Sequence, residues 1–532
     1  MRWITGGPDL PPELLQALED EQLVLFCGAG VSYPAGLPTF RGLVEKVYNQ
    51  LNQTLQGLEN AEFEKRNYDR VFGLLERRIG TSFVRHAVID TLRLDPHAVL
   101  STHKALLTLA TTRNGVCRLV TTNFDRGFEF AARPGTAIEA APKLPVPKLG
   151  VWNSVVHLHG LINDRDPDGH TLVLTGADFG TAYLTERWAS RFVSELFRRF
   201  TVLFVGYSVE DPVIRYMMDA FAADRILGEG VGRAYVLDGS LAAERPDKTA
   251  VWEAKGVIPI LYDSDDDHRA LHVTLAKWAD CHASGLLGRE NIITEHASSK
   301  KPVKPFDDDP VVSQVLWAIS EPSGHSALVF ARLDPLPPLE WLEALEERGL
   351  FRVAVAPDEG GIRAALVDPG YRSDSPSPLH PVTRALGEWL ARHIDNPELL
   401  NWVVRSGCSL HPDFRDILRR RMDSGANLPP ALKQIWGIIA SEAPIVWKKA
   451  QWSWFHLHAR LPAGEWNTVL RLELLDAITP VLALEPATLL RFFPRRVRRR
   501  NEDRSLLRCR SDPPVARPCH VDPRGSWPVA AT

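Results

Sequence analysis

Short apolar runs alternate with amphipathic stretches through the first half of the chain. The runs predict buried strands at Leu23–Cys27, Cys117–Val120, Val155–Leu158, Leu172–Thr175, Val202–Val205, Ala234–Leu237 and Val257–Leu261. Strands that are apolar on both faces and alternate with helices are typical of a parallel sheet covered on two sides. The expected fold class of this half is therefore α/β, with a Rossmann-like parallel sheet.

Apolar positions spaced three and four residues apart predict the helices between these strands. These helices are expected at 11–20, 42–94, 102–112, 181–199, 212–222 and 267–280. The segment 133–150 is rich in Pro, Gly and Ala, and is predicted to be a loop.

The strand pattern ends at Ser298–Pro310, a polar stretch with three prolines that is typical of a linker. Beyond it, helices are predicted at 311–320, 339–348, 382–394, 398–406, 414–423, 431–440 and 465–485. Many short helices of similar length favour an all-α C-terminal domain, arranged as a helical array. The expected organisation is a catalytic domain, a linker, a helical sensor or assembly domain, and an Arg- and Pro-rich disordered tail, at 1–290, 291–310, 311–490 and 491–532.

The composition is that of a globular protein, with 532 residues, 45% hydrophobic and 24% charged, and a net charge of −4. The six cysteines contain no C-x-x-C pair, so the sequence predicts neither a zinc ribbon nor a disulfide framework. We expect a reducing compartment, the cytoplasm, because the N-terminus lacks a signal-peptide core and no apolar run is long enough to span a membrane.

The stretch Leu23–Arg41 carries the first candidate for chemistry. A buried strand there breaks into a glycine turn, which is how α/β proteins make phosphate sites. The turn departs from the usual dinucleotide fingerprint, because no glycine returns three positions after Gly30. The residues that follow in its place are Ser32, Gly36, Pro38, Phe40 and Arg41.

Three further polar stretches begin where predicted strands end: Thr121–Asp125, His159-Gly160 and Gly206–Pro212. The carboxyl edge of a parallel sheet is where ligands bind in open α/β folds. We therefore expect all four stretches to meet at one site.

In this order, the four stretches resemble the sirtuin catalytic domain over roughly residues 15–285. GAG-x-S with G-x-P-x-FR resembles the first sirtuin signature, TTNFD the Q-N-x-D stretch, and His159-Gly160 the pair that holds the catalytic histidine. GYSVEDPVIR, with LVLTGADF upstream, resembles the sirtuin-like domains of bacterial antiphage defence proteins more than the deacylases. The resemblance implies NAD as substrate and no metal.

The resemblance implies a role for each residue at the phosphate end of the site. Ala29, Gly30 and Ser32 would place backbone and hydroxyl donors against the pyrophosphate, and Arg41 would add positive charge near the phosphates or the nicotinamide ribose. Phe40 precedes Arg41 in the same signature and is included among the cofactor-binding residues.

At the reacting end, the resemblance assigns two catalytic residues. His159 would be the general base, because an imidazole titrates near neutral pH. Asn123 would hydrogen-bond the ribose hydroxyls or hold a water beneath the anomeric carbon. Asp125 would shape the nicotinamide pocket or orient Asn123, and Thr122 belongs to the same cofactor-binding stretch. His157 is expected to be a buried structural histidine.

The later strands would contribute the ribose contacts. Gly206 and Ser208 match the sirtuin G-T-S turn loosely, and Asp238 would touch the adenosine ribose or lie in a solvated loop. Asp211-Pro212 is expected to be a helix N-terminus.

One departure from the family decides the expected reaction. Sirtuin deacylases carry a zinc ribbon after the catalytic histidine, whereas the interval from Gly160 to Val202 has no cysteine. Without that small domain, we expect water as the acceptor and NAD hydrolysis to ADP-ribose and nicotinamide. Two alternatives stay open: a protein deacylase or ADP-ribosyltransferase, and a non-catalytic NAD- or nucleic-acid-binding module that acts with a partner.

The defence resemblance also implies partners. We expect a homo-oligomer whose NAD-depleting activity is released during infection, by a phage protein or by a partner defence protein. Nucleic acid would bind only through such a partner or through residues 491–510, which hold nine arginines against two acids. No membrane association is expected.

Overall fold

The computed structural model describes residues 1–163, 166–208, 217, 232–354, 363–367, 378–406, 410–424, 428 and 430–440. The chain divides into two compact units, Met1–Leu366 with Ser377–His393, and Val367–Pro376 with Ile394–Thr532. The first unit contains the sheet. The predicted helices at 212–222 and 465–485 and the tail at 491–532 lie outside the described residues, apart from Met217.

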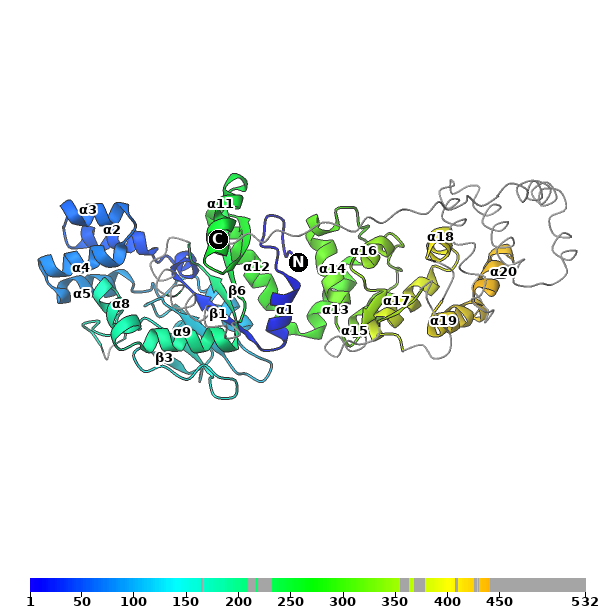
Figure 1. The fold of residues 1–532 in the computed structure, drawn as a ribbon, viewed down its shortest axis with the longest axis horizontal. Helices are drawn as coiled ribbons and strands as arrows, with labels where there is room; N and C mark the ends of the chain where they lie inside the picture. Colours follow the sequence, from blue (N-terminus) through cyan, green and yellow to red (C-terminus); the bar gives the residue numbers. More distant parts are fainter. Residues whose placement is uncertain are drawn as a thin grey trace, which may run out of the picture. The chain divides into compact units, whose positions relative to one another are not determined.

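Seven parallel strands form the main sheet, in the order β3-β4-β2-β1-β5-β6-β7 (Figure 1). They are β1 Leu23–Cys27, β2 Arg118–Thr121, β3 Ile138–Ala140, β4 Ser154–His157, β5 Thr201–Val205, β6 Ala234–Ser240 and β7 Ile258–Asp263. The strand order reverses at β1, which pairs with β2 on one side and β5 on the other. Such a reversal opens a crevice at the carboxyl ends of the central strands. The predicted α/β class is confirmed.

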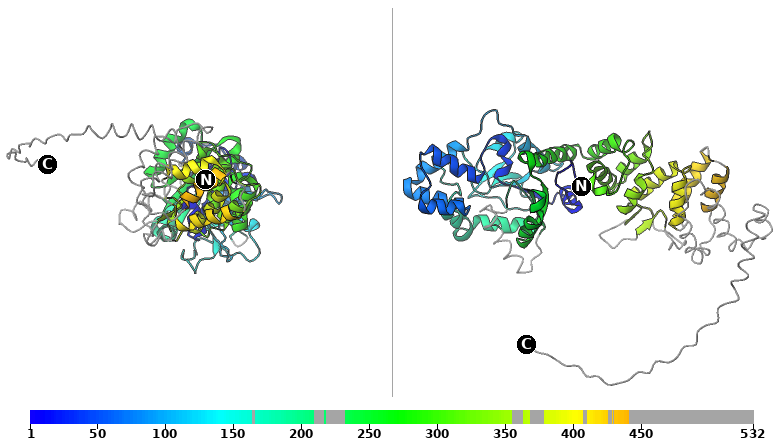
Figure 2. Two further views of the ribbon diagram at one scale, coloured as in Figure 1. Left: turned by 90° about the vertical axis from the view of Figure 1, so that its right-hand side faces the viewer. Right: turned by 90° about the horizontal axis from the view of Figure 1, so that it is seen from above.

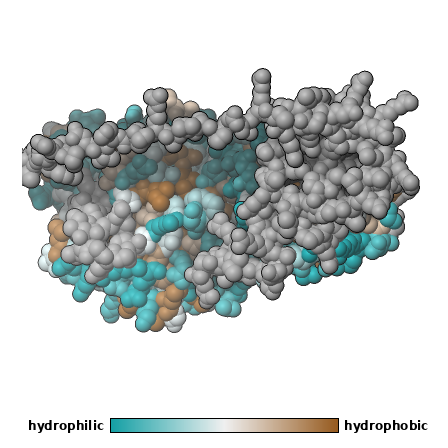
Figure 3. Space-filling model, turned by 45° about the vertical axis from the view of Figure 1, so that its right-hand side comes forward, coloured by the Kyte–Doolittle hydropathy of each residue, from teal (hydrophilic) through white to brown (hydrophobic). Residues whose placement is uncertain are grey.

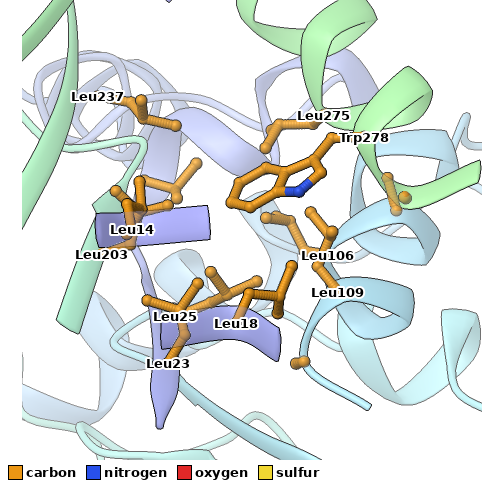
Figure 4. Close-up of a cluster of buried hydrophobic side chains, with 14 of the residues drawn as sticks. Leu14, Leu18, Leu23, Leu25, Leu106, Leu109, Leu203, Leu237, Leu275 and Trp278 are labelled. Carbon is orange, nitrogen blue, oxygen red and sulfur yellow. The ribbon is translucent and has the colours of Figure 1, made fainter. Parts of the chain in front are cut away.

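Alternate residues of the strands enter opposite cores. Leu25 packs toward α1 (Pro12–Glu19), α6 (Ser101–Leu109) and α12 (Asp265–Ser284), and Figure 4 shows the Trp278 ring among leucines of these helices and of β1. Each large apolar side chain buried in this way stabilises the fold by about 1.5–3 kcal/mol.

The opposite face of the sheet receives Val24, Phe26 and their neighbours in register. It is covered by α9 (Trp188–Arg199) and by Trp252 of α11 (Arg245–Ala254). The short helices α7 (Gly127–Ala131) and α8 (Gly176–Gly180) follow strands β2 and β4 in the chain. The sheet is therefore the middle layer of three.

A helical module connects β1 to β2 and has its own hydrophobic core, which includes Val44, Phe72 and Val88. Its helices are α2 Phe40–Gln50, α3 Gly57–Glu64, α4 Tyr68–Ile79 and α5 Thr81–Thr91. Figures 1 and 2 show these blue helices as a group at one end of the sheet. The module confirms the helical pattern predicted for 42–94.

Further helices follow the sheet along the chain. The first unit contains α13 Leu286–His296, α14 Pro310–Ile319, α15 His325–Arg332, α16 Trp341–Glu347 and α17 Pro381–Arg392. The second contains α18 Pro397–Arg405, α19 Pro412–Asp423 and α20 Pro430–Ile439. This confirms the helical C-terminal region, whereas the functional boundaries expected at 290, 310 and 490 stay predictions.

Four local predictions differ from the structure. Leu172–Thr175 is not a strand, because the backbone N–H of Val173 bonds to the carbonyl of His159 at 2.9 Å instead of entering a ladder. The predicted loop at 133–150 contributes the edge strand β3. The predicted helix 181–199 begins as a five-residue π-helical turn. Beyond the linker, β8 (Arg352–Ala354) and β9 (Arg363–Ala365) form a small antiparallel pair.

The described surface is mixed in polarity. On the face shown in Figure 3, brown hydrophobic areas lie among teal hydrophilic ones. Among the described residues, no helix has both the length and the apolar character needed to span a membrane.

Candidate functional site

Two glycine turns cross in direct backbone contact at the strand-order reversal. The N–H of Gly28 donates to the carbonyl of Val205 at 2.9 Å, and that of Gly30 to Gly206 at 3.0 Å. A Cβ on Gly30 would lie 2.9 Å from the Cα of Gly206, and a Cβ on Gly206 would lie 2.7 Å from the backbone nitrogen of Val31. Gly206 also has a φ of 77°, which favours glycine. Gly28 and Gly30 of the first predicted motif and Gly206 of the last therefore form one closely packed surface, which is called the glycine floor here.

The Asn123 side chain has a fixed orientation beside this floor. Its Nδ2 donates to the carbonyl of Gly28 and to Oγ of Ser32, both at 3.1 Å. Both amide protons are thereby used, and the carbonyl partner accepts only, so Nδ2 and Oδ1 cannot exchange places. Oδ1 of Asn123 has no hydrogen-bond partner among the described residues. It is therefore an acceptor that the site can offer to a ligand.

Ser32 links Asn123 to two further groups. Its hydroxyl donates to Oδ2 of Asp125 at 2.9 Å and lies 3.2 Å from Nε2 of His103. A hydroxyl has one proton, so His103 must donate through Nε2 while Ser32 accepts from both His103 and Asn123. The other carboxylate oxygen of Asp125 accepts from the N–H of Gly127 at 2.8 Å. Ser32 is thus saturated and buried, and in this structure it orients Asn123 instead of offering a phosphate donor.

His103 and His157 are fully buried behind this network. Burial lowers the pKa of both imidazoles. Nδ1 of His157 lies 2.9 Å from the carbonyl of Asn123, while Nδ1 of His103 and Nε2 of His157 have no hydrogen-bond partner in the part of the chain that the structure describes. The structural role predicted for His157 agrees with this bond to the motif's backbone.

His159 lies two residues after the end of β4, and it is 1% exposed. Its Nε2 is 2.9 Å from the hydroxyl of Tyr183, and the rings of Phe179 and Tyr183 meet it edge-on at centroid distances of 5.2 and 5.9 Å. Burial lowers the pKa of His159 to about 3, so the imidazole is neutral at pH 7. In this closed arrangement it is a weak base, and its role as general base stays a prediction.

Two cavities open beside these residues. The larger, of about 480 Å³, lies over the glycine floor, and the smaller, of about 70 Å³, reaches Asn123, Asp125 and His159. Ala29 and Phe40 line both. The arrangement provides one chamber the size of a nucleotide and, next to it, a narrow one with the candidate catalytic groups.

The larger cavity is rich in charged and aromatic side chains. Its lining includes the cations Arg41, Arg66 and Lys248, the histidines His268 and His272, the carboxylates Asp238 and Asp267, and Tyr33, Tyr68, Tyr207 and Tyr262. Three fixed cations against two carboxylates favour an anionic ligand such as a pyrophosphate. Burial lowers the pKa of His272 to about 4, so it adds no charge at pH 7.

The remaining predicted cofactor residues also meet at these cavities. Arg41 pairs with Glu45 at 3.0 Å and lies over the Phe63 ring. Ser208 is exposed at the rim of the larger cavity. Thr122 lines the smaller cavity, and its hydroxyl is 2.7 Å from that of Tyr207.

Asp238 lies inside β6 and not in a solvated loop. Its Oδ2 accepts from Nε1 of Trp252 at 2.8 Å, and Lys248 lies 3.7 Å from Oδ1. Burial raises the pKa of Asp238, against these two partners. It lines the larger cavity, where it can meet a ribose hydroxyl.

Sequence reasoning did not find four residues that complete the site: His103, Arg85, Phe179 and Tyr183. His103 gave one signal, a histidine at a position of its helix that the apolar spacing predicts to be buried. The other three acquire their meaning from contacts across long sequence separations. Among the described residues, no cluster of three His, Cys, Asp or Glu side chains could hold a metal ion.

Comparison with known proteins agrees with this geometry. Residues 118–260 match the model of the SIR2-like domain family. This part of the chain, from β2 to β7, is therefore similar to the SIR2-like domain family.

Two relatives show the extent of the likeness. An uncharacterized protein, y4cA, of Sinorhizobium fredii (strain NBRC 101917 / NGR234) is 35% identical over 269 residues, which are 49% of this chain and 22% of the relative. This chain thus matches about a fifth of that protein's length. A solved structure described as the structural basis for the mechanism and regulation of Sir2 enzymes is 14% identical, with a TM-score of 0.27, and covers 51% of this chain and 100% of its own.

Proposed function

We propose that the sirtuin-like domain is an NAD glycohydrolase, which cleaves the nicotinamide–ribose bond to give nicotinamide and ADP-ribose. The observation that carries this proposal is the fixed amide of Asn123. Its Oδ1 accepts no hydrogen bond from the described residues, and Asn123 lines the narrow cavity, next to a chamber large enough for the rest of the dinucleotide.

The larger cavity would hold the ADP part of NAD. The crossing glycine turns leave no side chain between backbone and ligand, so the pyrophosphate can approach the turn closely. The N–H groups of Gly28 and Gly30 stay bonded to the carbonyls of Val205 and Gly206, so the predicted backbone donor at Gly30 is already used in this structure. Arg41 and Lys248 would supply charge, and Asp238 would accept a hydrogen bond from the adenosine ribose. The nicotinamide ribose would then lie near Ala29 and Phe40, where the two cavities meet.

Cleavage builds positive charge on the ribose as nicotinamide leaves with the electron pair of the glycosidic bond. Asn123 would accept a hydrogen bond from a ribose hydroxyl or from the attacking water, and the buried carboxylate of Asp125 would stabilise the charge from behind Ser32. Little reorganisation is needed, because Ser32 and the Gly28 carbonyl already hold the amide.

Water is the acceptor that the enclosure of His159 favours. A deacylase must bring an acylated lysine to this histidine, but here Tyr183 is bonded to its Nε2 and Phe179 lies against its ring. The narrow cavity leaves room for a small acceptor. Attack by water transfers one proton to solvent and yields free ADP-ribose.

Nicotinamide release from NAD by the purified chain tests the proposal. We expect release by the wild-type chain and a loss of about 10²–10³ in kcat for Asn123→Ala, the range typical of removing one preorganised polar group. His159→Ala should also reduce the rate. Release that is unchanged in both variants would refute the site assignment, and Asn60→Ala, at an exposed position, is the matched control.

In the cell, we propose that this activity depletes NAD as a triggered effector of antiphage defence. The support is the likeness of GYSVEDPVIR and LVLTGADF to defence-associated domains, together with the need to restrain an enzyme that destroys NAD. We propose that the helical region or assembly into a homo-oligomer restrains the NAD-cleaving activity. A phage protein or a partner protein would then release it. Measuring NAD in infected cells that express the wild-type or the Asn123→Ala chain tests this role.

A further inference from the structure

The segment after His159 turns back and covers it; residues 169–185 are called the cover segment here. Gly160 makes the return feasible, because its φ is 97° and a Cβ there would lie 2.6 Å from the carbonyl oxygen of Thr171. Val173 then bonds through its N–H to the carbonyl of His159 at 2.9 Å. The cover segment therefore packs directly on the end of β4.

A single arginine of the helical module holds the cover segment. Arg85 of α5 is 4% exposed, and its guanidinium donates to the carbonyls of Gly169 and Leu172 at 2.6 and 3.0 Å. It also donates to Asp178 at 2.7 Å and to Glu76 at 2.9 Å. A planar guanidinium suits such a set of fixed acceptors, and burial makes the loss of any partner costly.

Asp178 connects Arg85 to the helix that carries the aromatic residues of the cover segment. Its carboxylate accepts from the backbone N–H and hydroxyl of Thr175 at 2.8 and 2.9 Å, which closes a capping box at the start of α8. The helix then places Phe179 against the His159 ring, and the π-helical turn Thr181–Thr185 places the Tyr183 hydroxyl on Nε2. The rings of Phe179 and Tyr183 also stack on each other, at 22° between planes.

We propose that Phe179 and Tyr183, held in place by Arg85 and Asp178, select the acceptor of the reaction by size. The Phe179 ring is a wall of the narrow cavity that contains Asn123 and His159. A cavity of about 70 Å³ would admit water and the smallest alcohols more readily than longer alcohols or an acylated lysine side chain. This inference rests on the proposed glycohydrolase function and adds a further activity, the transfer of ADP-ribose to small alcohols.

The chemistry of this transfer is balanced without any further reactant. The bond from ribose C1′ to the nicotinamide nitrogen breaks, and nicotinamide leaves with the electron pair. A bond from the alcohol oxygen to C1′ forms, and the hydroxyl proton passes to solvent. NAD and an alcohol therefore give nicotinamide, an alkyl ADP-ribose and one proton, in competition with hydrolysis.

The test compares products from NAD in water containing methanol or 1-butanol at equal concentration. The wild-type chain should form methyl ADP-ribose and almost no butyl ADP-ribose. Phe179→Ala and Arg85→Gln should raise the butyl fraction by at least about tenfold, the usual discrimination of a pocket wall. Arg78→Gln is the matched control, because Arg78 bonds to Glu59, Gln53 and Thr54 within the same module and not to the cover segment. An unchanged butyl fraction, with nicotinamide still released, would overturn the inference.

A second measurement does not depend on turnover and therefore separates this inference from the proposed function. Diethyl pyrocarbonate modification of His159, located by mass spectrometry, should be slow in the wild-type and Arg78→Gln chains and faster by about tenfold or more in Phe179→Ala, where the wall is removed. Rapid modification of wild-type His159 would refute the enclosure. If Phe179→Ala fails to fold, Phe179→Leu serves in both measurements, whereas absence of nicotinamide release from every chain would count against the proposed function alone.

Discussion

The amide nitrogen of Asn123 donates to the backbone carbonyl of Gly28 across 95 positions of sequence, at 3.1 Å. This bond joins the residues after β2 to the glycine turn after β1 and fixes the amide of Asn123, which lines the narrow cavity. The orientation of the candidate catalytic group is therefore a property of the sheet edge itself, present before any ligand binds.

The first prediction concerns replacement of the Asn123 amide by a carboxylate. Asn123→Asp replaces a donor by an acceptor that faces the Gly28 carbonyl and Ser32 Oγ. We expect loss of nicotinamide release and a free energy of unfolding lowered by about 1–3 kcal/mol, because buried acceptors then lack donors. Urea titration of Asn123→Asp and of the exposed control Asn60→Asp checks this, and equal stability of the two would contradict the assigned amide orientation.

The second prediction concerns Ser32. Ser32→Ala removes the acceptor of Asn123 and the donor to Asp125, so it should lower the free energy of unfolding by about 1–3 kcal/mol. It should also lower kcat by a larger factor than it raises KM. Ser284→Ala removes an exposed hydroxyl bonded to a helix carbonyl and should change little. A raised KM at unchanged kcat would instead return Ser32 to the phosphate contact suggested by the family.

The third prediction concerns the glycine floor. Gly206→Ala places a Cβ 2.7 Å from backbone at a φ of 77°, which costs at least about 1–2 kcal/mol from the backbone conformation alone. The temperature of thermal unfolding should fall, and the affinity for NAD should decrease. Gly180→Ala is the control, since a Cβ there meets no atom within 4 Å. A fully stable Gly206→Ala chain would contradict the close crossing of the two turns.

The fourth prediction uses the pKa of His159, which is about 3 in the folded chain and about 6.5 in an unfolded one. The unfolded state binds the extra proton between these values, so this histidine's stabilising contribution is complete above about pH 6.5 and is lost as the pH falls toward 3. The contribution changes by up to about 1.4 kcal/mol per pH unit within that window.

The variant His159→Gln tests whether His159 makes the folded state less stable as the pH falls. Between pH 7 and pH 5, the free energy of unfolding should fall less steeply for His159→Gln than for the wild-type chain. The exposed control His86→Gln should follow the wild-type slope. Equal slopes in all three proteins would show that His159 accepts a proton freely and is not enclosed by Tyr183.

Much of the fold followed from the sequence because the strands are short, apolar on both faces and followed by polar motifs. Leu23–Cys27 and Val202–Val205 could be read as neighbours of a parallel sheet, and parallel strands bring their carboxyl ends to one edge. The run Leu172–Thr175 is equally apolar and therefore predicts a strand, but it bonds to His159 and Arg85 instead of entering a ladder.

The full site could not be read from the sequence, since its remaining parts depend on tertiary packing. His103 lies on α6 and meets Ser32 across 71 positions, and Arg85 meets Asp178 across 93. A helical pattern indicates which face is buried, but not which polar atom on another element it reaches. The unexpectedly low pKa of His159 has the same origin, because burial by Phe179 and Tyr183 causes it.

The most direct test of the central claim is the product balance when the purified chain acts on NAD in the presence of an acetyl-lysine peptide. We predict nicotinamide and free ADP-ribose in equal amounts, a ratio unaffected by the peptide, and a rate that falls in Asn123→Ala. Formation of O-acetyl-ADP-ribose by the wild-type chain, or nicotinamide release no greater than that of Asn123→Ala, would contradict an NAD glycohydrolase at this site.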